Sequence, residues 1–435
     1  MKKFVRRFLS ALLMLFMVLL ASPAGRAEAG SDAPAPLSFG SDGTFTIMLL
    51  SDLQSTQFVS PHLLRALKGV LLNNTPDLII LLGDQLEGGS PVMRLGSDER
   101  NMDNALSQMM QPIAASGVPF AVLLGNHDHE FPVDAQTQFD WYSRYGTYIG
   151  SPTVAPGAEQ NEGSYVQSLP VYASDGSGDV KLNLYLFDCG RNLPDGGYGA
   201  ISRASVDWYN AESARLKEEN GGQAVPGAAF SHVVLPEVYE LFDVVSSGAA
   251  GAMQGVGLAA GRFYLPNGKR IFLGEVNEAP CPSTENNGLF DAFIGNDDVF
   301  LSVSGHDHVN SFIGAVRGVD MASAPGATFT SYNTRETRGV RLFRFREDIV
   351  RDYDTTFVPF SDFDGAEGIG AISYWLTTTT GAFYRPYKTI LVVLVLGVIF
   401  FFLLRALFQL DSNDHKLPDM PEEDDDYDQP EDDWV

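Results

Sequence analysis

Short apolar runs alternate along the middle of the chain with longer segments whose apolar residues recur at helical spacing. The short runs predict buried strands, and the helical spacing predicts helices that pack on them. The expected strands are 45–50, 78–82, 120–124, 182–187, 228–230 and 299–303, and the expected helices are 61–74, 101–115 and 203–219. Hairpin-like runs follow near 311–319 and 340–345, so the whole pattern indicates a layered α/β domain. The segment 248–261, rich in Gly and Ala, is expected to be a flexible insertion.

The first residues, 1–29, have the pattern of a secretory signal peptide. Four basic residues precede an almost unbroken apolar run from Phe8 to Ala21, and Ala27-Glu28-Ala29 offers a cleavage site. The alternative is an uncleaved anchor, but Pro23 and the small residues after the run count against it. The pattern therefore predicts export.

A second apolar run lies near the other end of the chain. Sixteen residues from Thr389 to Leu404 carry no charge and are flanked by Lys388 and Arg405. A spanning helix usually needs about 20 apolar residues, but flanking Lys and Arg side chains extend the effective length. A buried core helix is the alternative, and the lack of a polar face argues against it. We expect a juxtamembrane segment at 361–384 and one transmembrane helix over 385–408, with the central domain extracytoplasmic and the tail cytoplasmic.

Composition and charge narrow the classes of function. The chain of 435 residues has 29 Lys and Arg against 55 Asp and Glu, a formal net charge of −26. Such a chain would be repelled by a phosphate backbone, so no nucleic-acid partner is expected. The acidic tail, 409–435, is expected to be disordered, and the sequence identifies no protein partner for it. Cys189 and Cys281 are too few for a disulfide scaffold, and one bridge or two unpaired thiols remain open alternatives.

Polar residues collect where the expected strands end. Five of these ends carry Asp52 with Gln54, Asp84, Asn126-His127-Asp128, His232, and His306-Asp307-His308. Open α/β sheets bind ligands at the carboxyl ends of their strands, so we expect these residues to converge on one rim. Four of the seven histidines of the chain lie in these segments, and a fifth, His129, follows Asp128 directly. Imidazole and carboxylate are ligands that Zn²⁺, Fe²⁺ and Mn²⁺ accept, and a carboxylate shared between two ions would give a two-metal hydrolytic site.

The order of these motifs resembles that of the calcineurin-like metallophosphoesterases. The match runs over roughly residues 45–310, through Asp52-x-Gln54, Gly83-Asp84, Gly125-Asn126-His127-Asp128, His232 and Gly305-His306-x-His308. The residues around His232 and His306 further resemble the branch related to the purple acid phosphatases. The resemblance implies an α/β fold, a four-layer α-β-β-α sandwich of two mixed sheets, over residues 45–360 and after a linker at 30–44.

The resemblance also implies a role for each motif residue. One divalent metal ion would be held by Asp52, Gln54, Asp84 and His308, and the other by Asp84, Asn126, His232 and His306, with Asp84 bridging. His127 would protonate the leaving oxygen or bind the phosphate, and Asp128 would orient it. His129 would contact the substrate, with a solvated loop position as the alternative.

Two departures from the family pattern affect the expected metals. Gln54 stands where the family usually has His, and an amide oxygen is a harder and weaker ligand, which favours Mn²⁺ or looser binding. The segment Gly83-Asp84-Gln85-Leu86-Glu87 lacks the tyrosine that colours purple phosphatases, so a purple Fe³⁺ centre is not expected. The cofactors would be two divalent ions of Mn, Fe or Zn.

The resemblance implies a metal-dependent phosphoesterase that hydrolyses phosphate mono- or diesters through metal-activated hydroxide, anchored outside the cytoplasmic membrane. No Gly-x-Ser-x-Gly elbow and no Gly-x-x-x-x-Gly-Lys loop occur in the sequence, so other nucleophile chemistry finds little support. The alternative is a catalytically inactive, membrane-anchored binding or signalling protein, which Gln54 and the acidic tail would suit. Retention of the six other ligands favours the enzyme.

Overall fold

The computed structural model of the chain describes residues 35–158, 164–194, 196–363 and 393–405. The chain divides into two compact units, Met1–Thr380 and Gly381–Val435. The predicted signal peptide and the acidic tail lie outside the described residues, as do most of the predicted juxtamembrane segment and both ends of the predicted membrane helix.

A five-stranded mixed sheet forms one half of the first unit. Its strand order is β16-β15-β1-β2-β3. The bounds are β1 Thr44–Leu50, β2 Leu78–Leu82, β3 Phe120–Leu123, β15 Gly339–Arg346 and β16 Asp354–Pro359. Because β1, β2 and β3 run parallel, their carboxyl ends lie at the same edge, whereas β15 and β16 are antiparallel additions.

An eight-stranded mixed sheet forms the other half, in the order β11-β13-β14-β12-β7-β6-β5-β4. Its four central strands, β6, β7, β12 and β14, all run parallel to one another. The bounds are β4 Thr153–Val154, β5 Tyr165–Tyr172, β6 Val180–Phe187, β7 Gly227–Ser231, β11 Ile271–Leu273, β12 Val299–Ser304, β13 Ile313–Val316 and β14 Val319–Ser323. The carboxyl ends of β7 and β12 therefore also share one edge.

Helices connect the strands and begin and end at recognisable capping residues. The helix α2 begins where the Ser60 hydroxyl accepts the His62 N–H, and α3 ends at Gly117, which adopts the left-handed conformation. The α-helices are α2 Pro61–Asn73, α3 Asp98–Ser116, α4 Asn126–His129, α5 Ala135–Tyr142, α6 Arg203–Glu219 and α7 Leu289–Asn296. Short 3₁₀ turns are η1 Pro91–Arg94, η2 Pro236–Leu241, η3 Gly257–Ala259 and η4 Phe360–Asp362.

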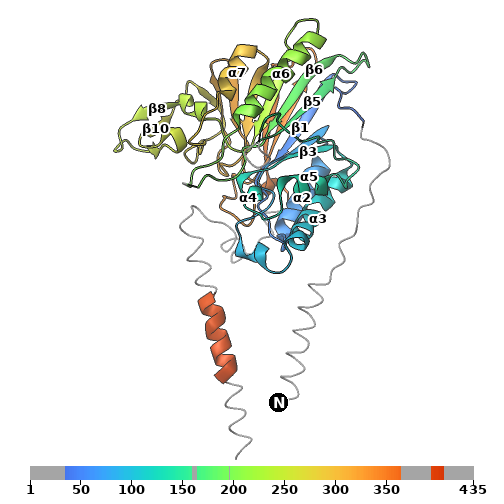
Figure 1. The fold of residues 1–435 in the computed structure, drawn as a ribbon. Coiled ribbons are helices and arrows are strands. Elements are labelled where there is room, and N and C mark those ends of the chain that lie inside the picture. The colour runs from blue at the N-terminus through green and yellow to red at the C-terminus, as the bar shows by residue number, and fades with distance from the viewer. Residues whose placement is uncertain (1–34, 159–163, 195, 364–392, 406–435) are drawn as a thin grey trace, which may run out of the picture. The chain divides into compact units, whose positions relative to one another are not determined.

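Three hydrophobic cores separate the first unit into four layers. Along β1, Ile47 and Leu49 face the core between the two sheets, whereas Met48 and Leu50 face the core under α2 and α3, as the two-residue period of a strand requires. A third core lies between the eight-stranded sheet and the helices α6 and α7. Figure 1 shows α2, α3 and α5 on one side of the sheets and α6 and α7 on the other. The predicted α/β class with two mixed sheets is confirmed.

Two segments differ from the sequence-based expectation. Leu37 and Phe39, in the expected linker, are buried in the core between the sheets, and Ser38 pairs with Tyr172 of β5. The expectation of a flexible insertion at 248–261 is wrong. This segment contains β9 Met253–Gln254 and η3, and a three-stranded sheet joins β9 to β10 Phe263–Pro266 and β8 Phe242–Val245. Its partner strands lie on either side of the Gly-rich window, so composition within the window did not reveal them.

The described part of the second unit is one helix over residues 393–405. None of the helices within the described ranges has both the length and the apolar character that crossing a membrane demands. In the first unit, Cys189 and Cys281 are both free thiols among the described residues.

Candidate metal centre

The candidate site lies where the carboxyl ends of five strands meet. The loops after β1 and β2 are joined by backbone hydrogen bonds, from the Asp52 N–H to the Gly83 carbonyl at 3.1 Å and from the Gln54 N–H to the Asp84 carbonyl at 2.8 Å. On the other sheet, the Gly305 N–H donates to the His232 carbonyl at 3.1 Å. Each sheet therefore presents its strand-end loops as one connected edge.

Side chains of the site connect the two sheets to each other. The His232 Nδ1–H donates to the Leu82 carbonyl at 2.9 Å, and the His306 backbone N–H donates to Asp52 Oδ2 at 3.1 Å. The first contact also sets the tautomer of His232. When Nδ1 of a neutral ring carries the proton, the lone pair that can bind a metal ion is on Nε2. The His308 Nδ1–H likewise donates to the Tyr332 carbonyl at 2.7 Å.

Backbone strain is concentrated at the same residues. Asp52, Gln54, Asp84 and His306 have φ values of 53°, 36°, 54° and 69°, in the left-handed region that side chains other than glycine rarely adopt. Strained backbone persists only where the surroundings over-determine it, and it is concentrated at functional sites. The strand-end positions are therefore held against a local conformational cost.

Two glycines permit the close approach of these loops. A Cβ atom on Gly125 would overlap the Asp84 carboxylate, and one on Gly83 would overlap the His232 ring. Gly83 also has a φ of 88°, which glycine adopts without steric cost. These two glycines, which precede Asp84 and Asn126, thus leave room for the side chain of another strand end.

Asp84 and Asp52 are the centres of two groups of polar atoms. Asp84 Oδ2 lies 3.1 Å from His232 Nε2 and 3.3 Å from Gln54 Nε2. The side chains of Asp84, His232 and His306 each offer a ligand atom within 4.8 Å of the others. Asp52 Oδ1 lies 3.3 Å from His308 Nε2 and 3.8 Å from His232 Nε2. Among the carboxylates and imidazoles expected as ligands, the structure brings together Asp52, Asp84, His232, His306 and His308.

Buried atoms without hydrogen-bond partners show that this donor set fits metal ions. Within the described residues, no hydrogen bond satisfies Asp52 Oδ1, Gln54 Oε1, Asn126 Oδ1 or His232 Nε2. A buried polar atom without a partner is costly, by roughly 1–3 kcal/mol each. All four atoms belong to residues expected as ligands and are of the kinds that divalent transition metals bind. The donor set therefore fits divalent metal ions.

The electrostatics of the site favour ionised carboxylates beside a neutral ligand ring. Burial alone would raise the pKa of Asp84, but the nearby His232 and His127 hold it well below its ordinary value. Burial and the charge of His232 lower the pKa of His306 to about 3, so His306 is neutral at physiological pH. A neutral imidazole is the form that binds a metal ion.

His127 lies at the border of the buried group and is partly exposed, with 29% of its side-chain surface accessible. Its backbone N–H donates to Asp84 Oδ1 at 2.8 Å, and its Nε2 lies 4.0 Å from Asp84 Oδ2. Its Nδ1 lies 2.7 Å from Glu130 Oε2. Burial lowers the pKa of His127, but Asp84 and Glu130 outweigh this effect and raise it to about 10.

Asp128 does not make the expected contact with His127. Its carboxylate accepts backbone N–H groups of Gly125, Gln85 and Leu86 at 3.0, 3.2 and 2.8 Å, and so joins the loops after β2 and β3. The contact with His127 comes instead from Glu130. The physical reason is helical spacing, since residues three apart share one face of α4 whereas adjacent residues do not.

His129 points into the protein. Its Nε2 lies 2.8 and 3.0 Å from the two carboxylate oxygens of Asp188, and only 5% of its side-chain surface is accessible. The structure therefore does not place His129 as a substrate contact, nor in a solvated loop position.

Sequence reasoning missed several residues around the ligands. The Tyr332 ring stacks on His308 with ring centres 4.1 Å apart, and its hydroxyl donates to Glu278 Oε1 at 3.1 Å. The Tyr198 ring packs edge-on against His306 at 4.2 Å. These residues lie far from the motifs along the chain and carry no signal there. Glu130 is the exception: it lies three residues after His127, a spacing that places two side chains on the same face of a helix.

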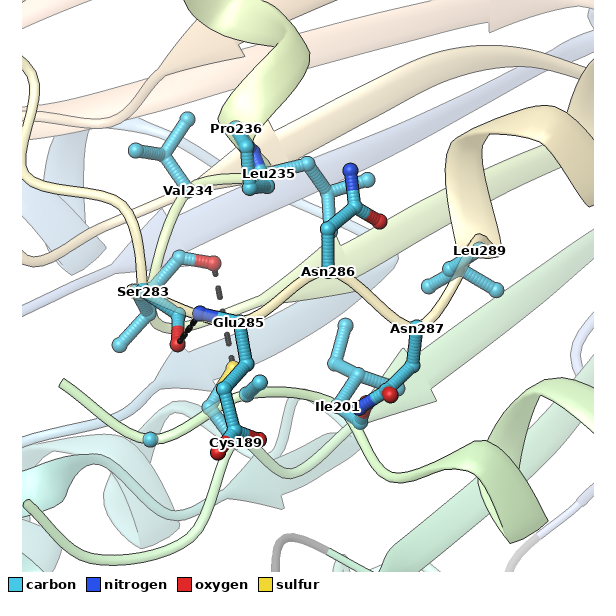
Figure 2. Close-up of a pocket in the computed structure, with 13 residues that line it drawn as sticks. Cys189, Ile201, Val234, Leu235, Pro236, Ser283, Glu285, Asn286, Asn287 and Leu289 are labelled. Carbon is cyan, nitrogen blue, oxygen red and sulfur yellow. Dashed lines mark hydrogen bonds between the residues drawn. The ribbon is translucent and has the colours of Figure 1, made fainter. Parts of the chain in front are cut away.

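A small pocket lies next to the loop that carries His232. Figure 2 shows Val234, Leu235 and Pro236 from that loop opposite Ser283, Asn286 and Asn287. Its cavity of about 20 Å³ has room for roughly one water molecule. None of the described residues that line it is an expected metal ligand. The pocket is therefore separate from the metal centre.

Comparison with known proteins agrees with this geometry. The sequence model described as "Calcineurin-like phosphoesterase" matches residues 45–310, and the chain belongs to this family. Within it, the chain falls in the branch related to the purple acid phosphatases. It is 26% identical to "Probable inactive purple acid phosphatase 29" of Arabidopsis thaliana, over 65% of this chain and 65% of that protein. It is also 26% identical to "Probable inactive purple acid phosphatase 14" of the same plant, over 75% of this chain and 81% of that protein.

The chain covers just under two thirds of the first of these relatives and more of the second. Among solved structures, it is similar to a dimetal phosphatase from Danio rerio, with 14% identity and a TM-score of 0.44, over 73% of this chain and 99% of that chain.

We predict that Gly125→Ala disturbs the site, because the added methyl group would press on the Asp84 carboxylate. The free energy of unfolding should fall by about 1–3 kcal/mol, the usual cost of overpacking, and bound Mn²⁺ should decrease. Urea denaturation and metal analysis measure both effects. Gly248→Ala is the control, because a Cβ there meets nothing within 4 Å. Equal behaviour of the two variants would contradict the close approach of the loops.

We predict that the His129–Asp188 pair stabilises the metal-free protein in a pH-dependent way. Burial opposes a charged His129, but Asp188 raises the pKa of His129 above its ordinary value. The stabilisation is therefore complete below the unfolded pKa of about 6.5 and is lost as pH rises through the raised folded pKa. Asp188→Asn should cost about 1.5–3 kcal/mol at pH 6 and clearly less at pH 9, by urea denaturation. An equal loss at both pH values would show that His129 stays uncharged.

Proposed function

We propose that this chain is a metal-dependent phosphoesterase that hydrolyses phosphate mono- or diesters. The observation that carries the proposal is the group of four buried ligand atoms without hydrogen-bond partners among the described residues, gathered around Asp52 and Asp84. Membership of the calcineurin-like phosphoesterase family supports the same reaction class. The substrate would be a phosphate ester.

The residues that would hold two divalent ions are those at the strand ends. Asp52, Gln54, Asp84 and His308 would bind the first ion, and Asp84, Asn126, His232 and His306 the second. Ions of Mn, Fe or Zn bound there would supply Lewis-acid stabilisation of the phosphate charge and a water of lowered pKa.

The side chains of the protein would have two roles, to orient the ligand rings and to donate a proton to the leaving oxygen. Hydrogen bonds from Nδ1 to backbone carbonyls fix the rings of His232 and His308, so that Nε2 of each faces the carboxylates. His127 is the partly exposed member of the group, and its Nε2 lies 4.0 Å from Asp84 Oδ2. It would donate a proton to the leaving oxygen, a role that usually accelerates a reaction by about 10²–10⁴-fold.

The alternative is an inactive binding or signalling protein of the same fold. Gln54 is a weaker ligand than the family's usual histidine, and its amide Nε2 faces Asp84 while its Oε1 is left without a hydrogen-bond partner among the described residues. The two plant relatives are named as probable inactive phosphatases, which describes those proteins. Metal content and turnover together separate the two alternatives. No bound ion, or one weakly held ion, would mean that the ligand set is incomplete and would favour the inactive protein.

We predict that His127→Ala keeps both metal ions but lowers turnover by about 10²–10⁴-fold, because the proton donor is lost while the ligands remain. Asp84→Asn should lose both metal and turnover, because a neutral amide replaces the carboxylate that would bridge the two ions and that lies beside His232 and His306. Metal analysis after incubation with Mn²⁺, Fe²⁺ or Zn²⁺, together with assays on aryl phosphate mono- and diesters, measures these effects.

The native chain is the reference for this comparison. Two bound ions without turnover on either ester class would favour the inactive alternative. Normal metal content in Asp84→Asn would contradict the bridging role of Asp84. Loss of metal in His127→Ala would mean that His127 acts as a ligand or supports one.

We also propose that the chain is exported and anchored in a membrane by a single C-terminal helix, with the phosphoesterase domain extracytoplasmic and the acidic tail cytoplasmic. The support comes from the signal-like pattern at 1–29 and from the apolar sequence of 385–408. The described helix at 393–405 has large apolar side chains that are exposed by 37–62%, which is costly in water. A bilayer is one environment that would cover such a helix on all sides.

We predict that the full chain sediments with membranes and resists extraction by alkaline carbonate. The double variant Val395→Arg/Val398→Arg should shift to the soluble fraction, because each central charge costs about 2.5–3.5 kcal/mol in a spanning helix. Val395→Leu/Val398→Leu is the matched control and should stay with the membranes. A soluble native chain would overturn the proposed anchor.

A further inference from the structure

The imidazole of His127 lies between two carboxylates. Its Nδ1 is 2.7 Å from Glu130 Oε2, and its Nε2 is 4.0 Å from Asp84 Oδ2 in the metal centre. The two contacts use opposite nitrogens of one ring, so Glu130 defines which nitrogen faces the centre. Glu130 is outside the family motifs that the sequence analysis used.

Glu130 is itself held by several parts of the chain. Its Oε1 accepts the Asn192 Nδ2–H at 3.0 Å, and its backbone carbonyl accepts the Arg94 Nη2–H at 2.8 Å. Gly89 lies directly against the carboxylate, because a Cβ on it would come within 2.5 Å of Glu130 Oε2. Segments after β2, after β3 and after β6 thus converge on this one carboxylate.

His127 would be free to turn without this contact. Its side chain is 29% accessible, and it stands at the beginning of α4, a helix of a single turn. Proton transfer requires a donor within about 3 Å of the accepting oxygen and correctly oriented. A ring that rotates into solvent loses that geometry, whereas a ring fixed at Nδ1 keeps Nε2 directed at the centre.

We infer that Glu130 is a positioning residue that orients His127 for proton donation to the leaving oxygen, and that Asn192 holds Glu130 in place. This inference rests on the proposed function, because it concerns the same centre. An ordinary ion pair on the surface of a helix can also join residues three apart. Such a pair would need neither the hydrogen bond from Asn192 to Glu130 nor a glycine at position 89 to make room for the carboxylate.

The chain offers a matched control close by. His129 and Asp188 form a second histidine–carboxylate contact at 2.8 Å, which is buried and directed away from the metal centre. Asp188→Asn therefore removes the same chemistry without touching the proton donor. It should lower stability and leave the dependence of the rate on the leaving group unchanged.

The test compares Glu130→Ala, Glu130→Gln, Asn192→Ala and Asp188→Asn in the full chain loaded with Mn²⁺. Phenyl phosphate has a poor leaving group that needs a proton, whereas 4-nitrophenyl phosphate has a good one that hardly does. For Glu130→Ala, kcat on phenyl phosphate should fall by about 10- to 100-fold, and on 4-nitrophenyl phosphate by less than about 3-fold, since only part of the general-acid contribution is removed. Glu130→Gln keeps a neutral acceptor for Nδ1–H and should lie between Glu130→Ala and the native chain. Asn192→Ala should show the same pattern more weakly, and metal content should not change.

A second readout is independent of turnover. In the metal-free chain labelled with ¹⁵N-histidine, the Nδ1–H proton of His127 should be protected from exchange with water and lose that protection in Glu130→Ala. Equal losses on the two phosphates in Glu130→Ala, or unchanged Nδ1–H protection, would overturn the positioning role while the proposed function stands. A metal-loaded native chain that hydrolyses neither phosphate would overturn the proposed function, and this inference with it.

Discussion

The rest of the structure depends on the burial of two carboxylates, Asp52 and Asp84, at one point between two sheets. Both are fully shielded from solvent, and an isolated buried charge is strongly unfavourable unless it is paired or bound to a metal. Imidazoles of His232, His306 and His308 surround them, and several neighbouring atoms still lack a hydrogen-bond partner within the described residues. Ligand atoms of the centre therefore remain without hydrogen-bond partners among the described residues, and metal ions would bind them. This is the physical basis for placing function at this rim.

The fold supplies what such a centre requires. Parallel strands deliver their carboxyl ends to one edge of each sheet, and the contacts of His232 with Leu82 and of His306 with Asp52 hold the two edges against each other. The cost appears as left-handed backbone at four of the expected ligands, Asp52, Gln54, Asp84 and His306, and as glycine at positions 83 and 125, where another side chain approaches closely. Packing on both faces of each sheet, in three separate cores, provides the rigidity that maintains this strain.

Four histidines near the rim illustrate how the environment of one residue type decides its role. His232 and His308 donate from Nδ1 to backbone carbonyls and keep Nε2 for the centre. His127 donates toward Glu130 and stays partly exposed, as a proton donor must. His129, only two residues further along, turns inward to Asp188 and stabilises the loop. Sequence motifs place these histidines in one group, whereas the partner of each ring distinguishes the proposed ligands and the proposed acid from the structural residue.

The sequence by itself determined the layered α/β class, the strands β1, β2, β3, β6, β7 and β12, the helices α2, α3 and α6, and the strand-end residues of the rim. Local signals sufficed for these, because apolar periodicity reflects burial and strand ends are marked by Gly, Asp and His. Only the tertiary structure decided that Glu130 rather than Asp128 contacts His127, that His129 is buried, and that the segment 248–261 is part of a small sheet. Hydrogen bonds across sheets and ring contacts such as Tyr332 on His308 join residues far apart in the chain. These contacts depend on how the folded layers pack against each other, and this packing produces no local pattern in the amino-acid sequence.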